Sequence, residues 1–155
     1  MCLRRWHRVS SKPARKMPVT RLTFGKYAEA KLHMKTQATT LYPFVPSGPN
    51  FELAIAFFTA LGFEKQWEHD GLAGMRFGGA YFMLQKIDVP EWQKNQMITF
   101  EVADLVSYWA EIEPKNLPKQ FPGAGLRPPT DFPWGREIHI IDPGGACWHV
   151  RQAKA

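Results

Sequence analysis

The chain has 155 residues, of which 45% are apolar and 14% aromatic, which suits one folded domain with a substantial core. It contains no apolar run of the roughly 20 residues that a membrane helix needs, and no charged-then-apolar leader that would direct secretion. It has two cysteines, one near the start and one in a predicted strand, which favours a reduced, cytoplasmic protein.

The positive charge is concentrated at the start of the chain. Residues 1–33 hold nine Lys and Arg against one Glu, a net charge of +8, whereas residues 34–155 hold eleven against thirteen acidic residues, a net charge of −2. We therefore expect a basic, disordered extension over residues 1–38 and a single domain over residues 39–153. Three interpretations of the extension stay open: an arm for nucleic acid or another anionic surface, an organelle transit peptide, or a gene-start artefact with translation beginning at Met34.

The first half of the domain predicts the order β-α-β-β-β. A short apolar strand over 41–45 precedes Asn50, a suitable helix N-cap because its side chain can accept a hydrogen bond from the first turn. Apolar residues then recur at helical spacing as far as Leu61, and Gly62 suits the left-handed position that ends a helix. Three further strands are predicted over 63–68, 72–77 and 80–86.

The second half repeats this order more weakly. Apolar and polar residues alternate over 98–102, which indicates a half-buried strand, and Asp104 can cap a second helix that Pro114 stops. The segment 115–129 is rich in Pro and Gly and predicts a loop with one short strand near 125–127.

Two strands joined by a tight turn are predicted between Phe132 and Val150. Ile138 and Ile140 alternate with Glu137, His139 and Ile141, and Trp148 and Val150 alternate with Cys147, His149 and Arg151. The turn between them reads Asp142-Pro143-Gly144-Gly145, in which Asp can bond the following backbone, Pro presets φ and Gly accepts a positive φ.

Together these patterns predict an α+β fold built from paired β-α-β-β-β modules over about 41–88 and 95–152. Neither module can close a core alone. Pairing them gives a curved, cup-shaped mixed sheet whose concave face is available to a ligand.

Three segments of the domain form a recognisable set: Phe57–Phe63, Ile98–Leu105, and Pro133–Glu137 followed by Asp142-Pro143 and Gly145. In this order they resemble the glyoxalase / bleomycin resistance protein / extradiol dioxygenase superfamily, which has the vicinal oxygen chelate (VOC) fold. Within the superfamily, Pro-Trp-Gly-Arg-Glu, Asp-Pro-x-Gly and the Cys-x-His of the last strand are most similar to the bleomycin-resistance proteins. The resemblance implies a homodimer with an exchanged N-terminal strand and ligand clefts at the dimer interface.

The resemblance also implies four inward-facing positions that carry His or Glu in the metal-dependent enzymes of the superfamily. In this chain they fall on Pro43 or Tyr42, Gln85, Met97 and His149. A catalytic divalent ion usually needs about three N or O ligands, and proline and a thioether do not supply them. We therefore expect no metal, no cofactor and no catalytic residue, with His149 forming hydrogen bonds on the cup wall. His139, alone on its strand, is expected to be structural.

Trp134 is the first candidate for ligand contact, since the resemblance implies that the matching Trp lines the drug cleft and stacks on drug rings. Leu72 replaces a cleft Phe of the bleomycin-resistance proteins, which argues against bleomycin itself. Arg136 could pair with Glu137 or with a ligand, and Glu101 could contact a cation. The expected ligand-binding residues are Trp134, Arg136, His149, Gln85, Leu72, Glu101 and Trp92.

These features favour non-catalytic binding of a small aromatic or cationic molecule, of the drug-sequestration type that the resemblance implies. The alternative is a metal-dependent enzyme of the glyoxalase, lyase or dioxygenase type with an atypical site. A nucleic-acid-associated protein that uses the basic extension ranks last, and no membrane partner is expected.

Overall fold

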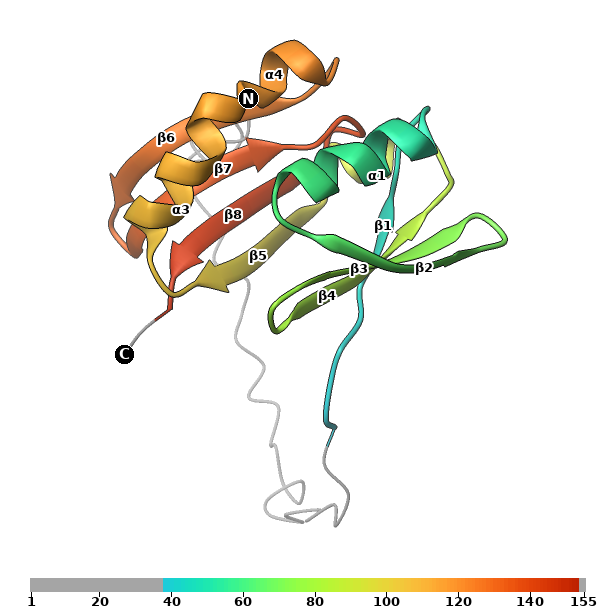
Figure 1. Ribbon diagram of the computed structural model, residues 1–155, viewed down its shortest axis with the longest axis horizontal. Helices are drawn as coiled ribbons and strands as arrows, with labels where there is room; N and C mark the ends of the chain where they lie inside the picture. The colour runs from blue at the N-terminus through green and yellow to red at the C-terminus, as the bar shows by residue number, and fades with distance from the viewer. Residues whose placement is uncertain (1–37, 154–155) are drawn as a thin grey trace, which may run out of the picture. The chain divides into compact units, whose positions relative to one another are not determined.

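The computed structural model describes residues 38–153, and one compact unit begins at Tyr42. The predicted basic extension therefore lies, except for Ala38, outside the described residues. In chain order the elements are β1 (Phe44–Pro46), α1 (Phe51–Ala60), β2 (Glu64–His69), β3 (Leu72–Phe77), β4 (Ala80–Gln85), α2 (Pro90–Gln93), β5 (Met97–Val102), α3 (Leu105–Ile112), the 3-10 turn η1 (Glu113–Lys115), α4 (Leu117–Gln120), β6 (Gly125–Phe132), β7 (Gly135–Ile141) and β8 (Cys147–Gln152) (Figure 1).

The strands form two four-stranded mixed sheets, in the orders β1-β4-β3-β2 and β5-β8-β7-β6. In each sheet the first strand of the module runs parallel to the last, and the other neighbours are antiparallel. The two halves thus share one β-α-β-β-β topology, and the predicted α+β fold of paired modules is confirmed. No helix within residues 38–153 has the length and apolar character of a membrane span.

Both long helices begin where the sequence predicts. The side chain of Asn50 accepts a 2.9 Å hydrogen bond from the backbone N–H of Leu53, and that of Asp104 accepts one of 2.9 Å from Val106. These bonds satisfy donors that have no partner inside the helix. Gly62 follows α1 with a φ of 104°, which a side chain would strain.

The segment 115–129 is more regular than predicted. It contains α4 and most of β6, which continues to Phe132 instead of ending near residue 127. Two consecutive prolines argue against a strand here, because proline has no backbone N–H to donate a hydrogen bond to a neighbouring strand. β6 is an edge strand, and its pairing with β7 shifts register between Arg127 and Thr130, so both prolines fall within the irregularity.

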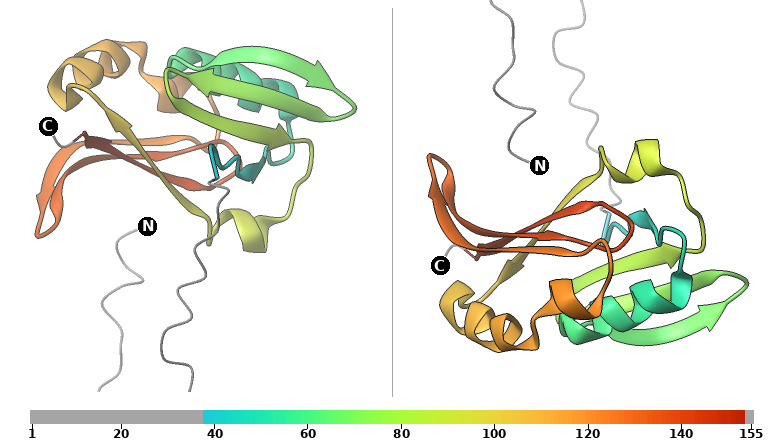
Figure 2. Two further views of the ribbon diagram at one scale, coloured as in Figure 1. Left: turned by 90° about the horizontal axis from the view of Figure 1, so that it is seen from below. Right: turned by 90° about the horizontal axis from the view of Figure 1, so that it is seen from above.

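Phe58 of α1 links the two sheets. Its ring packs edge-on against Phe82 of β4, with centroids 4.8 Å apart, and against Trp148 of β8, with centroids 5.0 Å apart. Figure 2 shows α1 and α3 on the same side of the second sheet, and Tyr108 of α3 donates a 3.0 Å hydrogen bond to the backbone carbonyl of Leu61. One hydrophobic core therefore joins both modules and leaves the other face of the second sheet turned away from these helices.

Asp142 organises the turn between β7 and β8. Its buried carboxylate accepts hydrogen bonds from the backbone N–H groups of Gly145 (2.8 Å) and Ala146 (3.0 Å) and from the indole of Trp148 (2.9 Å). Burial raises the pKa of Asp142 to about 6, and these donors, which favour the charged form, limit the rise. The predicted turn motif therefore fixes the register of the hairpin.

Replacing Phe58 by Ala should lower the free energy of unfolding by about 3–5 kcal/mol, because a cavity would open between the two sheets. Urea denaturation followed by circular dichroism measures the loss. Val106→Ala on α3, where the side chain is 62% exposed, is the control and should change stability by less than about 0.5 kcal/mol. Losses of equal size in the two variants would contradict the linking role of Phe58.

Asp142 should give the protein a pH-dependent stability. Between its ordinary pKa of 3.8 and about 6, the folded state keeps the carboxyl protonated while the unfolded chain has released the proton. The contribution of Asp142 to stability is therefore present at low pH and is lost as the pH rises through this window, by about 2–3 kcal/mol. Urea denaturation of the wild type and of Asp142→Asn at pH 4 and pH 7 tests this. A difference between the two proteins that does not vary with pH would contradict it.

Candidate functional site

Three polar side chains meet on the face of the second sheet that is turned away from α1 and α3. Glu137 and His139 stand two residues apart on β7 and share this face, while Ile138 between them is fully buried in the core. The same alternation on β8 buries Trp148 and turns His149 outward, where it is the register partner of His139.

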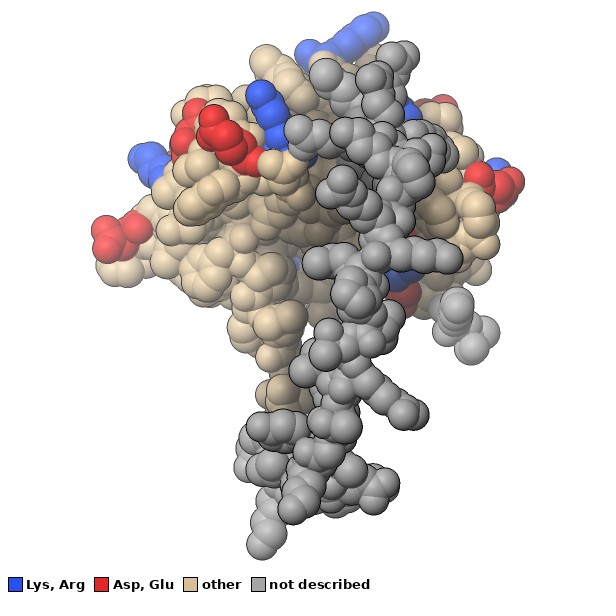
Figure 3. All heavy atoms as spheres, turned by 180° about the vertical axis from the view of Figure 1, so that it is seen from behind, with Lys and Arg blue, Asp and Glu red and all other residues tan. Residues whose placement is uncertain are grey.

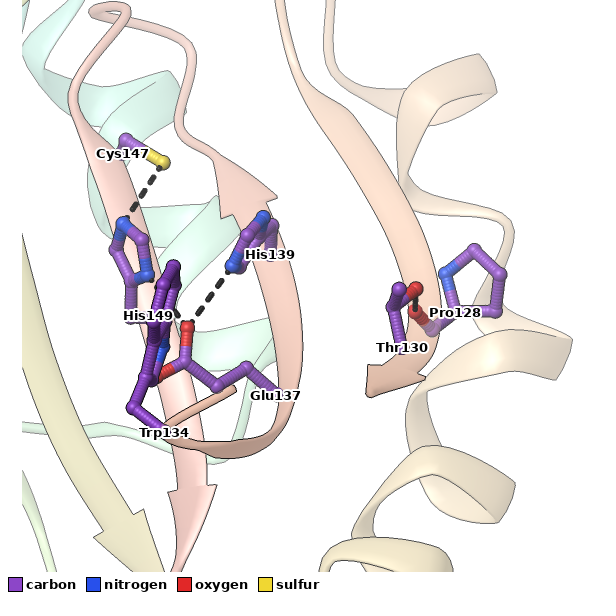
Figure 4. A network of polar contacts seen from close by, with 7 residues as sticks. All are labelled: Pro128, Thr130, Trp134, Glu137, His139, Cys147 and His149. Carbon is purple, nitrogen blue, oxygen red and sulfur yellow. Dashed lines mark hydrogen bonds and ion pairs between the residues drawn. The ribbon is translucent and has the colours of Figure 1, made fainter. Parts of the chain in front are cut away.

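The carboxylate of Glu137 is the centre of a hydrogen-bond network (Figure 4). Its Oε2 atom lies 3.0 Å from Nε2 of His139 and 2.8 Å from Nδ1 of His149. Its Oε1 atom accepts a 3.1 Å hydrogen bond from the indole Nε1 of Trp134. Neutral imidazoles donate to Oε2 when those two nitrogens carry the protons.

Burial and hydrogen bonding determine the charge of this network. The side chains of Glu137 and His139 are 3% and 4% exposed. Burial alone would raise the pKa of Glu137, but the bonds from His149, His139 and Trp134 outweigh it, and the pKa lies below its ordinary value. Burial lowers the pKa of His139, and the bond to Glu137 only partly offsets this. At neutral pH the arrangement is therefore a charged carboxylate beside a neutral His139.

Planar side chains surround the network. The ring of Phe132 stacks on that of His139, with centroids 5.0 Å and planes 17° apart, and on that of Trp134, with centroids 5.2 Å and planes 8° apart. We call these three side chains the ring stack. Trp134 is 60% exposed, so the ring stack presents an open indole surface.

Three side chains of the hydrogen-bond network, those of Glu137, His139 and His149, also form a ligand set that could hold a metal ion. One atom each from Glu137, His139 and His149 lies within 4.8 Å of the other two. The sequence pattern suggested that His139 stands alone. The hairpin register instead places it opposite His149. The ion-pair partner of Arg136 is Asp131, whose carboxylate lies 3.7 Å from the Arg136 guanidinium, whereas the Glu137 carboxylate contacts His139, His149 and Trp134.

Other predicted ligand residues line two separate pockets. Gln85 and Leu72 lie with Phe44 in a pocket of about 530 Å³ on the first sheet. Glu101 lies in a pocket of about 580 Å³ with Arg151, whose guanidinium is 3.6 Å from the Glu101 carboxylate.

Trp92 is 64% exposed on α2 and does not belong to the ring stack. Trp134 and His149 line neither of the two pockets. The predicted ligand-binding residues thus divide among separate surfaces of the single chain.

Solved structures match this arrangement of sheets. A bleomycin-binding protein complexed with bleomycin is 17% identical, with a TM-score of 0.64 over 76% of this chain and 100% of that chain. The bleomycin-binding protein of the bleomycin-producing Streptomyces verticillus, complexed with copper(II)-bleomycin, is 22% identical, with a TM-score of 0.59 over the same shares, 76% and 100%. This chain has the VOC fold.

A resistance protein against a different antibiotic has the same fold. The fosfomycin resistance protein of Listeria monocytogenes, complexed with Mn(II) and sulfate, is 13% identical, with a TM-score of 0.57 over 76% of this chain and 93% of that chain. No family model and no curated protein matches the sequence. The VOC fold is therefore established by structure, and the chemistry must be argued from the site.

The sequence pattern places Glu137 and His139 on one side of a strand, but sequence reasoning missed that His149 meets both of them. Two signals could have revealed it. Residues two apart on a strand share a face. In addition, the turn that pairs Ile141 with Cys147 also pairs His139 with His149, because register in a hairpin follows from its turn.

Removing the Glu137 carboxylate should destabilise the protein. Glu137→Ala leaves the imidazole donors of His139 and His149 without their acceptor, at a cost of about 1–3 kcal/mol for the buried His139 and less for His149, which is 19% exposed. We expect a loss of about 2–4 kcal/mol in urea denaturation. Glu101→Ala on the same sheet is the control, since its carboxylate is half exposed and its pairing with Arg151 should contribute less than about 1 kcal/mol. A loss no larger than that of the control would show that the network does not support the fold.

Proposed function

We propose that the protein binds a small planar aromatic molecule without transforming it and so sequesters it in the cytoplasm, as the bleomycin-resistance type of VOC protein does. The observation that carries this proposal is the stacking of Phe132 on Trp134, whose indole is 60% exposed. The likeness in fold to proteins complexed with bleomycin supports the same class of function.

The ring stack suits a planar guest for two physical reasons. Aromatic faces favour offset stacking, and their negative quadrupole attracts cations, so a planar cation gains from both effects. The hydrogen bond from Trp134 to Glu137 also holds the indole before the guest arrives. Less side-chain entropy is then lost on binding.

The charge of the surface is compatible with a neutral or cationic guest. Residues 34–155 carry a net charge of only −2. Among the described residues that are visible in Figure 3, acidic and basic side chains are interspersed among uncharged residues and do not gather into one block of either sign. Ring contact, more than long-range steering, would therefore select the guest.

The proposal includes a homodimer in which the first-sheet pocket of one copy faces the ring stack of the other. In the single chain, Phe44 of β1 is 52% exposed and Met97 of β5 is 53% exposed, and a second copy would cover such apolar side chains. This arrangement would also bring Leu72 and Gln85 of one copy toward Trp134 of the other.

A metal-dependent enzyme is the second candidate. Glu137, His139 and His149 supply the three N or O ligands that a catalytic divalent ion usually needs, which the four positions implied by the sequence resemblance do not. Turnover of a substrate by the metal-loaded protein, lost in His149→Ala, would favour this candidate over binding alone.

Ligand binding with and without the Trp134 indole tests the first proposal. Bleomycin and the planar cationic dye ethidium are titrated against the protein while tryptophan fluorescence and melting temperature are followed, because a guest that binds the folded state stabilises it. We expect binding of at least one probe, recovered chemically unchanged. Trp134→Ala should bind it about tenfold or more weakly, since losing an aromatic stack and its buried area costs about 1–3 kcal/mol.

Trp92→Ala is the matched control, because it removes a tryptophan of similar exposure, 64%, outside the ring stack. This variant should bind like the wild type. Undiminished binding by Trp134→Ala, or the absence of binding by both probes, would contradict the proposal for this class of ligand.

A further inference from the structure

We propose that Glu137, His139 and His149 together bind one divalent transition-metal ion of the zinc type. The inference goes beyond the proposed binding of an aromatic molecule, since stacking on Trp134 requires no metal. It also names the class of ion that the second candidate, a metal-dependent enzyme, would use. The site also differs from the metal position that the sequence resemblance implied, because only His149 belongs to both.

The ligand atoms already converge. Oε2 of Glu137 lies 3.0 Å from Nε2 of His139 and 2.8 Å from Nδ1 of His149. Ligands held at about 2.0–2.1 Å around a tetrahedral zinc ion are about 3.3 Å apart. An ion would therefore widen these two contacts by a few tenths of an ångström. It would also require the two ligand nitrogens, which lie within 4.8 Å of each other, to take up the same spacing by rotation of their side chains.

The chemistry of the donor set selects the ion. Two imidazole nitrogens and one carboxylate oxygen suit zinc, cobalt, nickel or copper, whereas magnesium and calcium prefer oxygen ligands throughout. Three protein ligands leave a fourth tetrahedral position for water or for a donor atom of a bound guest.

Burial of the carboxylate favours a cation at this place. The side chain of Glu137 is 3% exposed, and its hydrogen-bond partners are two imidazoles and the uncharged indole of Trp134. A buried negative charge is costly unless it is paired. A divalent ion balances it more completely than neutral donors do.

Neighbouring groups hold the three ligands in position. Trp134 donates to Oε1 of Glu137 and leaves Oε2 for the ion. Phe132 stacks on His139 and fixes the plane of that ring. Nε2 of His149 lies 3.6 Å from the sulfur of Cys147, so a proton that moves from Nδ1 to Nε2 when the ion binds meets a weak acceptor there. Such outer contacts orient metal ligands and raise affinity.

Zinc binding to the full chain tests the proposal. The protein is treated with a chelator, dialysed, and titrated with Zn²⁺ by calorimetry and with Co²⁺ by visible absorption. We expect one ion per chain and a Co²⁺ spectrum of four- or five-coordinate nitrogen and oxygen ligation. His139→Asn and His149→Asn should each weaken Zn²⁺ binding about 100-fold or more, because even the loss of an outer contact costs about 10–100-fold.

His69→Asn is the control, because His69 ends β2 in the first sheet and is exposed. It should leave the affinity for Zn²⁺ unchanged. Nitrogen-15 NMR of the wild-type imidazoles gives a readout that needs no variant, since Zn²⁺ should shift Nε2 of His139 and Nδ1 of His149. The proposal is overturned if binding is not stoichiometric, if both histidine variants bind like the wild type, or if the NMR shifts fall on other histidines.

Different experimental results would contradict the metal proposal and the proposed function. Trp134→Ala should lose the aromatic probe and still bind one Zn²⁺ ion per chain, with the affinity for Zn²⁺ lowered by no more than the about 10–100-fold that one outer contact contributes. His139→Asn should lose Zn²⁺ binding while the exposed indole surface of Trp134 remains. Each result therefore tests one proposal without deciding the other.

Discussion

Successive side chains of β7 and β8 point to opposite faces of the sheet, and both the core and the candidate site depend on this alternation. Each side chain that enters the core commits its neighbour to the opposite face. Ile138 and Ile140 are fully buried, so Glu137 and His139 must share the other face. A slip of one residue in this hairpin would place a carboxylate among the aromatic rings of the core, at a cost of several kcal/mol. The stability of the core and the geometry of the polar face therefore cannot vary independently.

Local patterns predict most of the fold because the forces that form these elements are themselves local. The caps at Asn50 and Asp104 act within one turn of helix, and the alternation on β7 and β8 is set by the pleat. Local patterns do not predict the full length of β6. Its two prolines are acceptable only because the strand lies at the edge of its sheet and pairs irregularly, and edge position is a property of the whole sheet.

The candidate site is less predictable than the fold, for a related reason. Comparing this chain with the metal-ligand positions of the superfamily singles out Gln85 and Met97 and leaves His139 as an isolated histidine. The contact between His139 and His149 depends on a register that the buried hydrogen bonds of Asp142 fix across the turn. Even with the register known, the meeting of both imidazoles at one oxygen of Glu137 depends on side-chain rotamers, which spacing along the chain does not contain.

The two oxygens of Glu137 connect the ring stack to the histidines. Oε1 accepts from Trp134 while Oε2 faces His139 and His149, and a carboxylate is rigid, so a displacement at one oxygen moves the other. An ion held at Oε2 would therefore restrict the indole on which a guest stacks. Binding of the ion and binding of the guest would then be thermodynamically coupled, and the coupling would act equally in both directions. A guest with a donor atom near its ring system would gain most, because it could contact Trp134 and complete the coordination of the ion on one face of the sheet.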